Sequence, residues 1–161
     1  MNYKPDIDSD IYDLENSFYL RSQPFRITKL LGQYELYKMI LDLPGSVVEC
    51  GVFKGVSLVR FATFRHCFET PESRKLIAFD AFGAFPNEDL IREDDIKFAQ
   101  AHGLEDGGQG ISKEDLEKLL IEKKFENIEL IKGNVTDTIP AYFEENQHER
   151  ISLLHLDMDI Y

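Results

Sequence analysis

One short stretch, Val47-Val48-Glu49-Cys50-Gly51-Val52-Phe53-Lys54-Gly55-Val56-Ser57, constrains the fold of this chain more than any other. The apolar run that ends in Glu49 and Cys50 is typical of an inner parallel strand, because both faces of such a strand are covered. Gly51 and Gly55 predict a tight turn, since glycine accepts positive φ and lets a ligand approach the backbone. The helix that follows presents free N–H groups to an anionic group. The stretch therefore predicts a strand, a glycine turn and a helix that can cradle a nucleotide-type ligand.

The glycine pattern alone does not distinguish a ligand site from a plain turn. Gly51 and Gly55 give a G-x-x-x-G spacing, which lacks the three-glycine fingerprint of a nicotinamide or flavin site. A strand-to-helix turn without a ligand uses glycines in much the same way. The function therefore has to be inferred together with the rest of the chain.

The composition favours one globular domain that binds a small molecule. With 161 residues, 43% of them apolar, the chain can bury a core and is too apolar for intrinsic disorder. The net charge of −12, without a Lys/Arg cluster, argues against nucleic acid and an anionic membrane surface as partners. Residues 1–6 lack the apolar core of a signal peptide, and no run is long enough to span a bilayer. We expect a cytoplasmic protein, with Cys50 and Cys67 as buried reduced thiols.

Periodicity and breaker residues divide the chain into an arm and an α/β domain. We expect residues 1–25 to form an acidic arm whose aromatic rings pack on a domain formed by residues 26–161. The expected elements are a helix over 26–43, a strand over 47–50, a helix over 55–68, a strand over 75–80, a helix over 112–124, an edge strand over 127–133, a helix opened by Thr138 and Pro140 that runs to Asn146, and a strand over 151–159. Strand, helix, strand connections are right-handed and parallel. The fold class is therefore α/β, with a Rossmann-like, mostly parallel sheet of about four strands in the order 3-2-1-4 and flanking helices.

Residues 83–110 are predicted to be an insertion in this domain. They combine several glycines with many Asp and Glu residues, and a loop of this length is usually either functional or disordered. We expect a mobile lid with a short helix near residues 90–101, in which His102 is the histidine to test.

Asp80 closes the second predicted strand. In doubly wound sheets, ligands bind beyond the carboxyl ends of the strands, where an acidic residue accepts hydrogen bonds from ribose hydroxyls. Phe79 and Phe82 flank Asp80 and could stack on an adenine. The alternatives are a surface aspartate that caps a loop and two rings that belong to the core.

Asp157 and Asp159 end the fourth predicted strand on one face, because side chains two residues apart point the same way. Such a pair suits Mg²⁺ or a similar cation, although water, substrate oxygens or other residues would have to complete the coordination. The alternative is that one carboxylate caps a loop and the other is exposed. We expect His155 to face the interior with a hydrogen bond and not to act as a ligand.

Taken together, four motifs resemble a known family. They are Leu43-Pro44-Gly45-Ser46-Val47-Val48-Glu49-Cys50-Gly51-Val52-Phe53-Lys54-Gly55, Ala78-Phe79-Asp80-Ala81-Phe82, Lys132-Gly133-Asn134-Val135-Thr136-Asp137-Thr138 and Leu154-His155-Leu156-Asp157-Met158-Asp159-Ile160-Tyr161. In this order they resemble the class I S-adenosylmethionine-dependent methyltransferases, and within them the macrocin O-methyltransferase group, which methylates sugar hydroxyls. Two departures are a displaced glycine in residues 81–86 and an end at Tyr161, before three more strands that family members possess. The chain thus looks like the cofactor half of a methyltransferase, whose exposed fourth strand invites pairing with a second copy.

The resemblance implies a role for each matched residue. Glu49, Gly51 and Gly55 line the methionine end of the cofactor, Asp80 binds its ribose, and Asn134 and Val135 lie near its adenine. The cofactor-binding residues that we expect are therefore Glu49, Gly51, Gly55, Ser57, Asp80, Phe82, Asn134 and Val135. Asp157 is the expected catalytic residue and first metal ligand, with Asp159 as the second.

These observations favour an S-adenosylmethionine-dependent O-methyltransferase that acts on a hydroxyl of a sugar or a related small molecule. The enzyme would align the reacting atoms and activate the hydroxyl with a divalent cation. One alternative is a truncated, non-catalytic cofactor-binding module. Another is a nucleotide-sugar transferase that uses Asp157-x-Asp159 as its metal motif.

Overall fold

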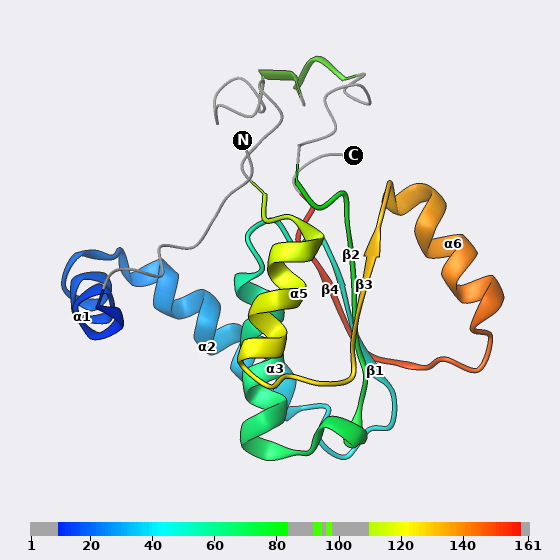
Figure 1. Cartoon of the computed structure of the whole chain (residues 1–161), viewed down its shortest axis with the longest axis horizontal. Helices are drawn as coiled ribbons and strands as arrows, with labels where there is room; N and C mark the ends of the chain where they lie inside the picture. The colour runs from blue at the N-terminus through cyan, green and yellow to red at the C-terminus, as the bar shows by residue number, and fades with distance from the viewer. Residues whose placement is uncertain (1–9, 84–91, 95, 98–109, 159–161) are drawn as a thin grey trace.

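A four-stranded parallel sheet forms the centre of the protein. The structure is a computed structural model that describes residues 10–83, 92–94, 96–97 and 110–158. The strands are β1 (Ser46–Cys50), β2 (Leu76–Asp80), β3 (Ile128–Lys132) and β4 (Ile151–Leu156). They are arranged in the order β3-β2-β1-β4 (Figure 1), which confirms the predicted fold class and strand order.

Burial in the sheet follows the apolar pattern of each strand. All five residues of β1 are buried, and so are the first four of β2. The edge strand β3 has one buried residue, Leu130, because its polar residues alternate with apolar ones. In the register of the sheet, Glu49 lies between Ala78 of β2 and His155 of β4. The central strand therefore carries a carboxyl group into the interior.

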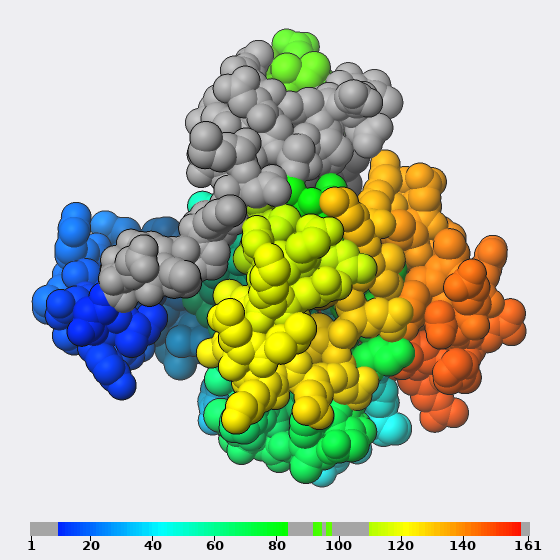
Figure 2. Space-filling model, in the orientation of Figure 1, coloured from blue at the N-terminus to red at the C-terminus, as the bar shows by residue number. Residues whose placement is uncertain are grey.

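Helices cover both faces of the sheet. The helices of the described chain are α1 (Ile11–Arg21), α2 (Pro24–Lys38), α3 (Val56–Phe68), the short 3-10 helix η1 (Pro71–Ser73), α5 (Lys113–Glu122) and α6 (Val135–Glu145), and of these α2, α3, α5 and α6 pack on the sheet. The larger core lies between the sheet and α2, α3 and α5, and it includes Tyr37, Phe61 and Leu116. The smaller core joins the other face to α6 through Phe79 and Tyr142. In the space-filling view, α5 (yellow) covers the front of the molecule between α1 (blue) and α6 (orange) (Figure 2).

The predicted packing of the N-terminal arm is wrong for the residues that the structure describes. Residues 11–21 form helix α1, which has no buried residue and extends away from the sheet (Figure 1). Tyr12 is 72% exposed and Tyr19 is 60% exposed. Ile11, Leu14 and Phe18 share one side of the helix by their spacing, but each of these side chains is exposed in the structure. Cys67 is also exposed, contrary to the prediction, because it lies on the outward side of α3, whereas Cys50 is buried and both thiols are free.

Three predicted boundaries also differ from the structure. Helix α2 ends at Lys38, and the next residues form turns instead of continuing the helix to residue 43. Helix α6 begins at Val135 and contains Pro140, because the side chain of Asn134 accepts the N–H of Thr136 and caps the helix earlier than predicted. Strand β4 ends at Leu156, whereas Asp159 lies outside the described residues, as do His102 and most of the predicted insertion.

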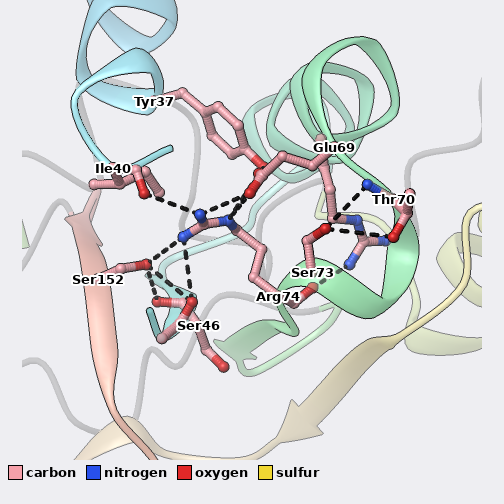
Figure 3. Close-up of polar contacts among 10 residues, drawn as sticks. Tyr37, Ile40, Ser46, Glu69, Thr70, Ser73, Arg74 and Ser152 are labelled. Atoms are coloured by element: carbon pink, nitrogen blue, oxygen red, sulfur yellow. Dashed lines mark hydrogen bonds and ion pairs between the residues drawn. The ribbon is translucent and has the colours of Figure 1, made fainter. Parts of the chain in front are cut away.

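A buried ion pair holds the amino ends of the strands together. Arg74, whose side chain is 2% exposed, pairs with Glu69 at 2.7 Å. Its guanidinium also donates to the carbonyl oxygens of Ile40 and Gly45 and to the hydroxyl of Ser152 (Figure 3). The Tyr37 hydroxyl donates to Glu69, and these hydrogen bonds outweigh burial and lower the pKa of the Glu69 carboxyl. The network holds the amino ends of the strands together. It does not involve the carboxyl ends, where ligands bind in parallel sheets.

Candidate cofactor site

Asp80 joins the end of β2 to the glycine turn that follows β1. Its Oδ2 atom accepts the backbone N–H groups of Val52 at 2.6 Å and Phe53 at 3.1 Å. Its Oδ1 atom accepts the N–H of Phe82 at 2.6 Å. The two segments that the sequence predicted to meet are therefore in direct contact, with the carboxylate between them.

Gly51 and Gly55 are required by both backbone conformation and packing. Their φ angles are +88° and +81°, in the region that side chains disfavour. A Cβ atom on Gly51 would lie 2.5 Å from the carbonyl oxygen of Asp157, and one on Gly55 would lie 2.9 Å from Cδ1 of Leu116. Gly51 thus allows the turn to pack against the end of β4, and Gly55 allows α3 to approach α5.

Glu49 places a carboxyl group directly beneath this turn. The residue is 0% exposed, and its Oε1 atom lies 3.0 Å from Nδ1 of His155. Among the residues that the structure describes, Oε2 has no hydrogen-bond partner. Burial raises the pKa of Glu49, although the neighbouring side chains of His155 and of Ser57 at the start of α3 oppose the shift. The prediction that His155 faces inward with a hydrogen bond is confirmed.

Two residues that contact this group were missed by sequence reasoning. Gln33 of α2 is 3% exposed, and its amide nitrogen lies 3.3 Å from Nε2 of His155. The guanidinium of Arg60, on α3, donates to the amide oxygen of Gln33 at 3.1 Å. The signal for Gln33 was its position in the apolar stripe of the helix, three residues after Leu30 and four before Tyr37.

Asp157 lies beside the glycine turn. Its backbone N–H donates to the carbonyl oxygen of Cys50 at 2.9 Å. Its carboxylate is paired with the ammonium of Lys29 on α2 at 2.6 Å. In the described ranges, no three His, Cys, Asp or Glu residues are grouped so that they could hold a metal ion. One carboxylate already bonded to a lysine does not fit a divalent cation, which needs six or more oxygen ligands.

The remaining predicted residues lie at the ends of β2 and β3. The N–H of Gly133 donates to the carbonyl oxygen of Asp80 at 3.0 Å, which places Asn134 and Val135 next to Asp80. The side chain of Asn134 is engaged as the cap of α6. Phe82 is 3% exposed and its ring belongs to the larger core, and Phe79 is buried as well. Both rings therefore pack in the apolar cores, and contact of Phe82 with a cofactor stays a prediction.

The two ends of the predicted insertion meet at the same place. The N–H of Ile111 donates to the carbonyl oxygen of Phe53 at 2.8 Å. A Cβ atom on Gly110 would lie 2.8 Å from the carbonyl oxygen of Gly83. The chain thus leaves and re-enters the fold beside the glycine turn.

Solved structures define the class of protein to which this fold belongs. A calicheamicin methyltransferase, CalS11, is 27% identical with a TM-score of 0.70, and the match covers 96% of this chain and 63% of that one. The apo structure of CalS11, described as a TDP-rhamnose 3′-O-methyltransferase, is 26% identical with a TM-score of 0.59 over 96% of this chain and 60% of that chain. The O-methyltransferase NovP, at 20% identity and a TM-score of 0.58 over 71% of this chain and 48% of that one, shares the fold. The architecture is that of a methyltransferase.

The sequence places the chain more narrowly. The profile of the macrocin-O-methyltransferase (TylF) family matches residues 35–161, and the chain belongs to this family. Comparison with curated proteins gives no match. The chain spans 63% of the length of the CalS11 structure. Across the described residues, no helix has the length and apolarity needed to cross a membrane.

Proposed function

We propose that this chain binds S-adenosylmethionine at the carboxyl ends of β1, β2 and β3, and that it serves methyl transfer to a hydroxyl of a sugar or a related small molecule. Membership of the TylF family and likeness to a TDP-rhamnose 3′-O-methyltransferase support the substrate class. The observation that carries the cofactor assignment is the buried carboxyl of Glu49, which lies below a glycine turn that Asp80 holds and whose Oε2 atom has no partner in the part of the chain that the structure describes.

The residues at the strand ends fit the chemistry of this cofactor. S-adenosylmethionine carries a positive sulfonium, an ammonium group and two ribose hydroxyls. Glu49 offers an acceptor for a cationic group, because its Oε2 atom has no partner among the described residues. A carboxylate has about four acceptor positions, and Asp80 uses three of them for backbone N–H groups. One position is left for a ribose hydroxyl.

Each residue of the site then has a distinct task. When bound, the cofactor supplies a methyl group on a positively charged sulfur. Glu49 holds the cationic end in an environment of low polarity, where its charge acts more strongly than in water. Asp80 fixes the ribose and the glycine turn together, which sets the position of the methionine end. Asp157, at the end of β4 beside the glycine turn, is the residue that we propose for contact with the acceptor hydroxyl.

Assistance by a divalent cation remains a prediction outside this mechanism. It would require Asp159 or other groups beyond the described residues, and Asp157 would have to exchange Lys29 for the cation. Isothermal titration with Mg²⁺ tests it, and the prediction is contradicted if Mg²⁺ binds neither the protein nor its cofactor complex.

Ligand-dependent thermal unfolding tests the proposed function. A ligand that binds only the folded state raises the melting temperature. S-adenosylhomocysteine should therefore raise it in the wild type and raise it much less in the Asp80→Asn variant. The exposed Asp137→Asn variant is the matched control. Protection by uridine diphosphate instead of S-adenosylhomocysteine would favour a nucleotide-sugar transferase. Cofactor binding without turnover on any nucleotide-linked sugar would favour a non-catalytic module.

A further inference from the structure

Four polar side chains from four elements form a continuous series below the glycine turn. Arg60 of α3 donates to Gln33 of α2, Gln33 contacts His155 of β4, and His155 contacts Glu49 of β1. Gln33 is 3% exposed and Glu49 is 0% exposed, and the His155 side chain is 15% exposed. The ring of Phe61 packs edge-on against the imidazole with a centroid distance of 5.3 Å. The series is therefore held by packing as well as by hydrogen bonds.

The direction of each hydrogen bond follows from the first one. A guanidinium has only donors, so the Gln33 oxygen must face Arg60 and the Gln33 NH₂ must face His155. Nε2 of His155 is then the acceptor, and the proton of the neutral ring lies on Nδ1. Nδ1 donates to Oε1 of Glu49. This assignment leaves no donor facing another donor.

We propose that Gln33 and His155 are positioning residues for Glu49: they fix the Nδ1–H tautomer of His155, which holds Oε1 and leaves Oε2 for the cationic end of the cofactor. The inference rests on the proposed function and adds two residues to it. Neither residue needs to touch the cofactor. Their effect is transmitted through the orientation of one buried carboxyl, which has no hydrogen bond to its second oxygen in the described part of the chain.

The substitution Gln33→Glu should reverse the direction of the hydrogen bond between residue 33 and His155, with little change in side-chain volume. A carboxylate at position 33 can accept from Arg60 and from His155, so the ring proton should move to Nε2. Nδ1 would then present a lone pair to Oε1 of Glu49. The hydrogen bond that holds the Glu49 carboxylate would be lost. Gln23→Glu, at an exposed position beside the same helix, is the matched control for added charge. His155→Phe removes the donor, whereas His155→Asn keeps a donor near the position of Nδ1 and should restore much of the effect.

Nitrogen NMR of the cofactor-free protein tests the tautomer without any reaction. His155 should show a protonated Nδ1 and an unprotonated Nε2 in the wild type and in Gln23→Glu. Gln33→Glu should show the opposite pattern. The Nε2–H form in the wild type would overturn the proposal.

Calorimetric binding tests the consequence for the site. S-adenosylhomocysteine carries the ammonium group, and 5′-methylthioadenosine lacks it. Gln33→Glu and His155→Phe should lower the affinity for S-adenosylhomocysteine by about tenfold or more, which is the loss expected for a charged hydrogen bond. The affinity of these variants for 5′-methylthioadenosine should stay within about twofold of the wild-type value. Gln23→Glu should bind both ligands with an affinity within about twofold of the wild type.

The outcomes separate this inference from the function on which it rests. Equal weakening of both ligands would indicate general damage and overturn the positioning role, and so would unchanged binding of S-adenosylhomocysteine. A wild type that binds neither ligand would overturn the proposed function itself. Selective weakening that His155→Asn reverses supports the proposal.

Discussion

At the scale of single residues, the buried carboxylate of Glu49 lowers the stability of the folded protein and, under the proposed function, binds the cationic end of the cofactor. Burial raises its pKa above the ordinary value of 4.5, because the charged form loses its hydration. The nearby charge of Asp157 acts in the same direction, whereas His155 opposes it. A carboxyl with a raised pKa in the folded state favours folding most at low pH, and this contribution is lost as the pH rises through the folded pKa.

Replacement of Glu49 by Gln should therefore stabilise the cofactor-free protein at neutral and alkaline pH. We expect a gain on the order of 1 kcal/mol at about pH 8, in line with the cost of unpaired buried polar groups, and little gain at about pH 5. S-adenosylhomocysteine should bind the variant much more weakly. Urea unfolding at the two pH values measures the first effect, with the exposed Glu144→Gln as control. A variant that is less stable at the higher pH would refute the argument.

Gly51 is the second residue whose substitution has a clear expected result. Gly51→Ala adds a Cβ atom 2.5 Å from the carbonyl oxygen of Asp157 at a φ of +88°. The strain and the displaced backbone should lower the free energy of unfolding by about 2 kcal/mol or more. Gly32→Ala is the matched control, since nothing lies within 4 Å of its Cβ position in α2. Gly32→Ala should stabilise the protein by about 0.5–1 kcal/mol. If Gly51→Ala and Gly32→Ala changed the free energy of unfolding equally in chemical denaturation, the prediction would be contradicted.

At the scale of elements, helix α6 depends on a cap at the edge of the candidate site. The Asn134 side chain accepts the N–H of Thr136 at 3.0 Å, and Pro140 removes one backbone hydrogen bond within the helix. Asn134→Ala should therefore cost about 1 kcal/mol in thermal or urea unfolding, and Asn134→Ser should restore most of the loss. If Asn134→Ala left the stability unchanged, the cap would not be needed, and packing of residues such as Tyr142 would be enough to hold the helix.

Sequence patterns predicted the strands because apolar runs and glycine turns are local signals, and the strand order followed from the Rossmann-like fold class to which they belong. The same reasoning located the Asp80 carboxylate beside the glycine turn, since parallel strands end at one edge. It misplaced the start of α6 because Pro140 is a stronger local signal than the Asn134 cap. The series from Arg60 to Glu49 could not be predicted, because its members are far apart in the chain and only the packing of α2 and α3 on the sheet brings them together.

At the scale of the whole molecule, β4 is an edge strand of the sheet that the described residues form, and it has exposed apolar side chains. Leu154 is 50% exposed and Leu156 is 61% exposed. They lie on the same face as Val48 and Cys50, their partners in register, but α6 covers only the part of this face beside β2. Open apolar edges favour pairing with another chain.

We therefore predict that the chain self-associates through β4. Leu154→Lys should shift the protein towards the monomer in sedimentation velocity experiments, because a charge on an edge strand opposes pairing. Ile121→Lys, which changes a residue of α5 that is 73% exposed, should leave the association unchanged. A wild type that stays monomeric at high concentration would argue against the interface.

The meeting of Gly83 and Gly110 has a consequence for how this fold can vary. Since the two glycines are already neighbours, a short linker can join them, and we expect the ends of β2 and α5 to keep their positions in such a variant. Such a shortened variant should retain the wild-type melting temperature within about two degrees in a thermal scan, which corresponds to a change of about 0.5–1 kcal/mol at most for a chain of this size. A large fall would show that the excised residues support the sheet. If the shortened protein is stable, the rest of the fold becomes a fixed scaffold on which different sequences between Gly83 and Gly110 can be compared directly.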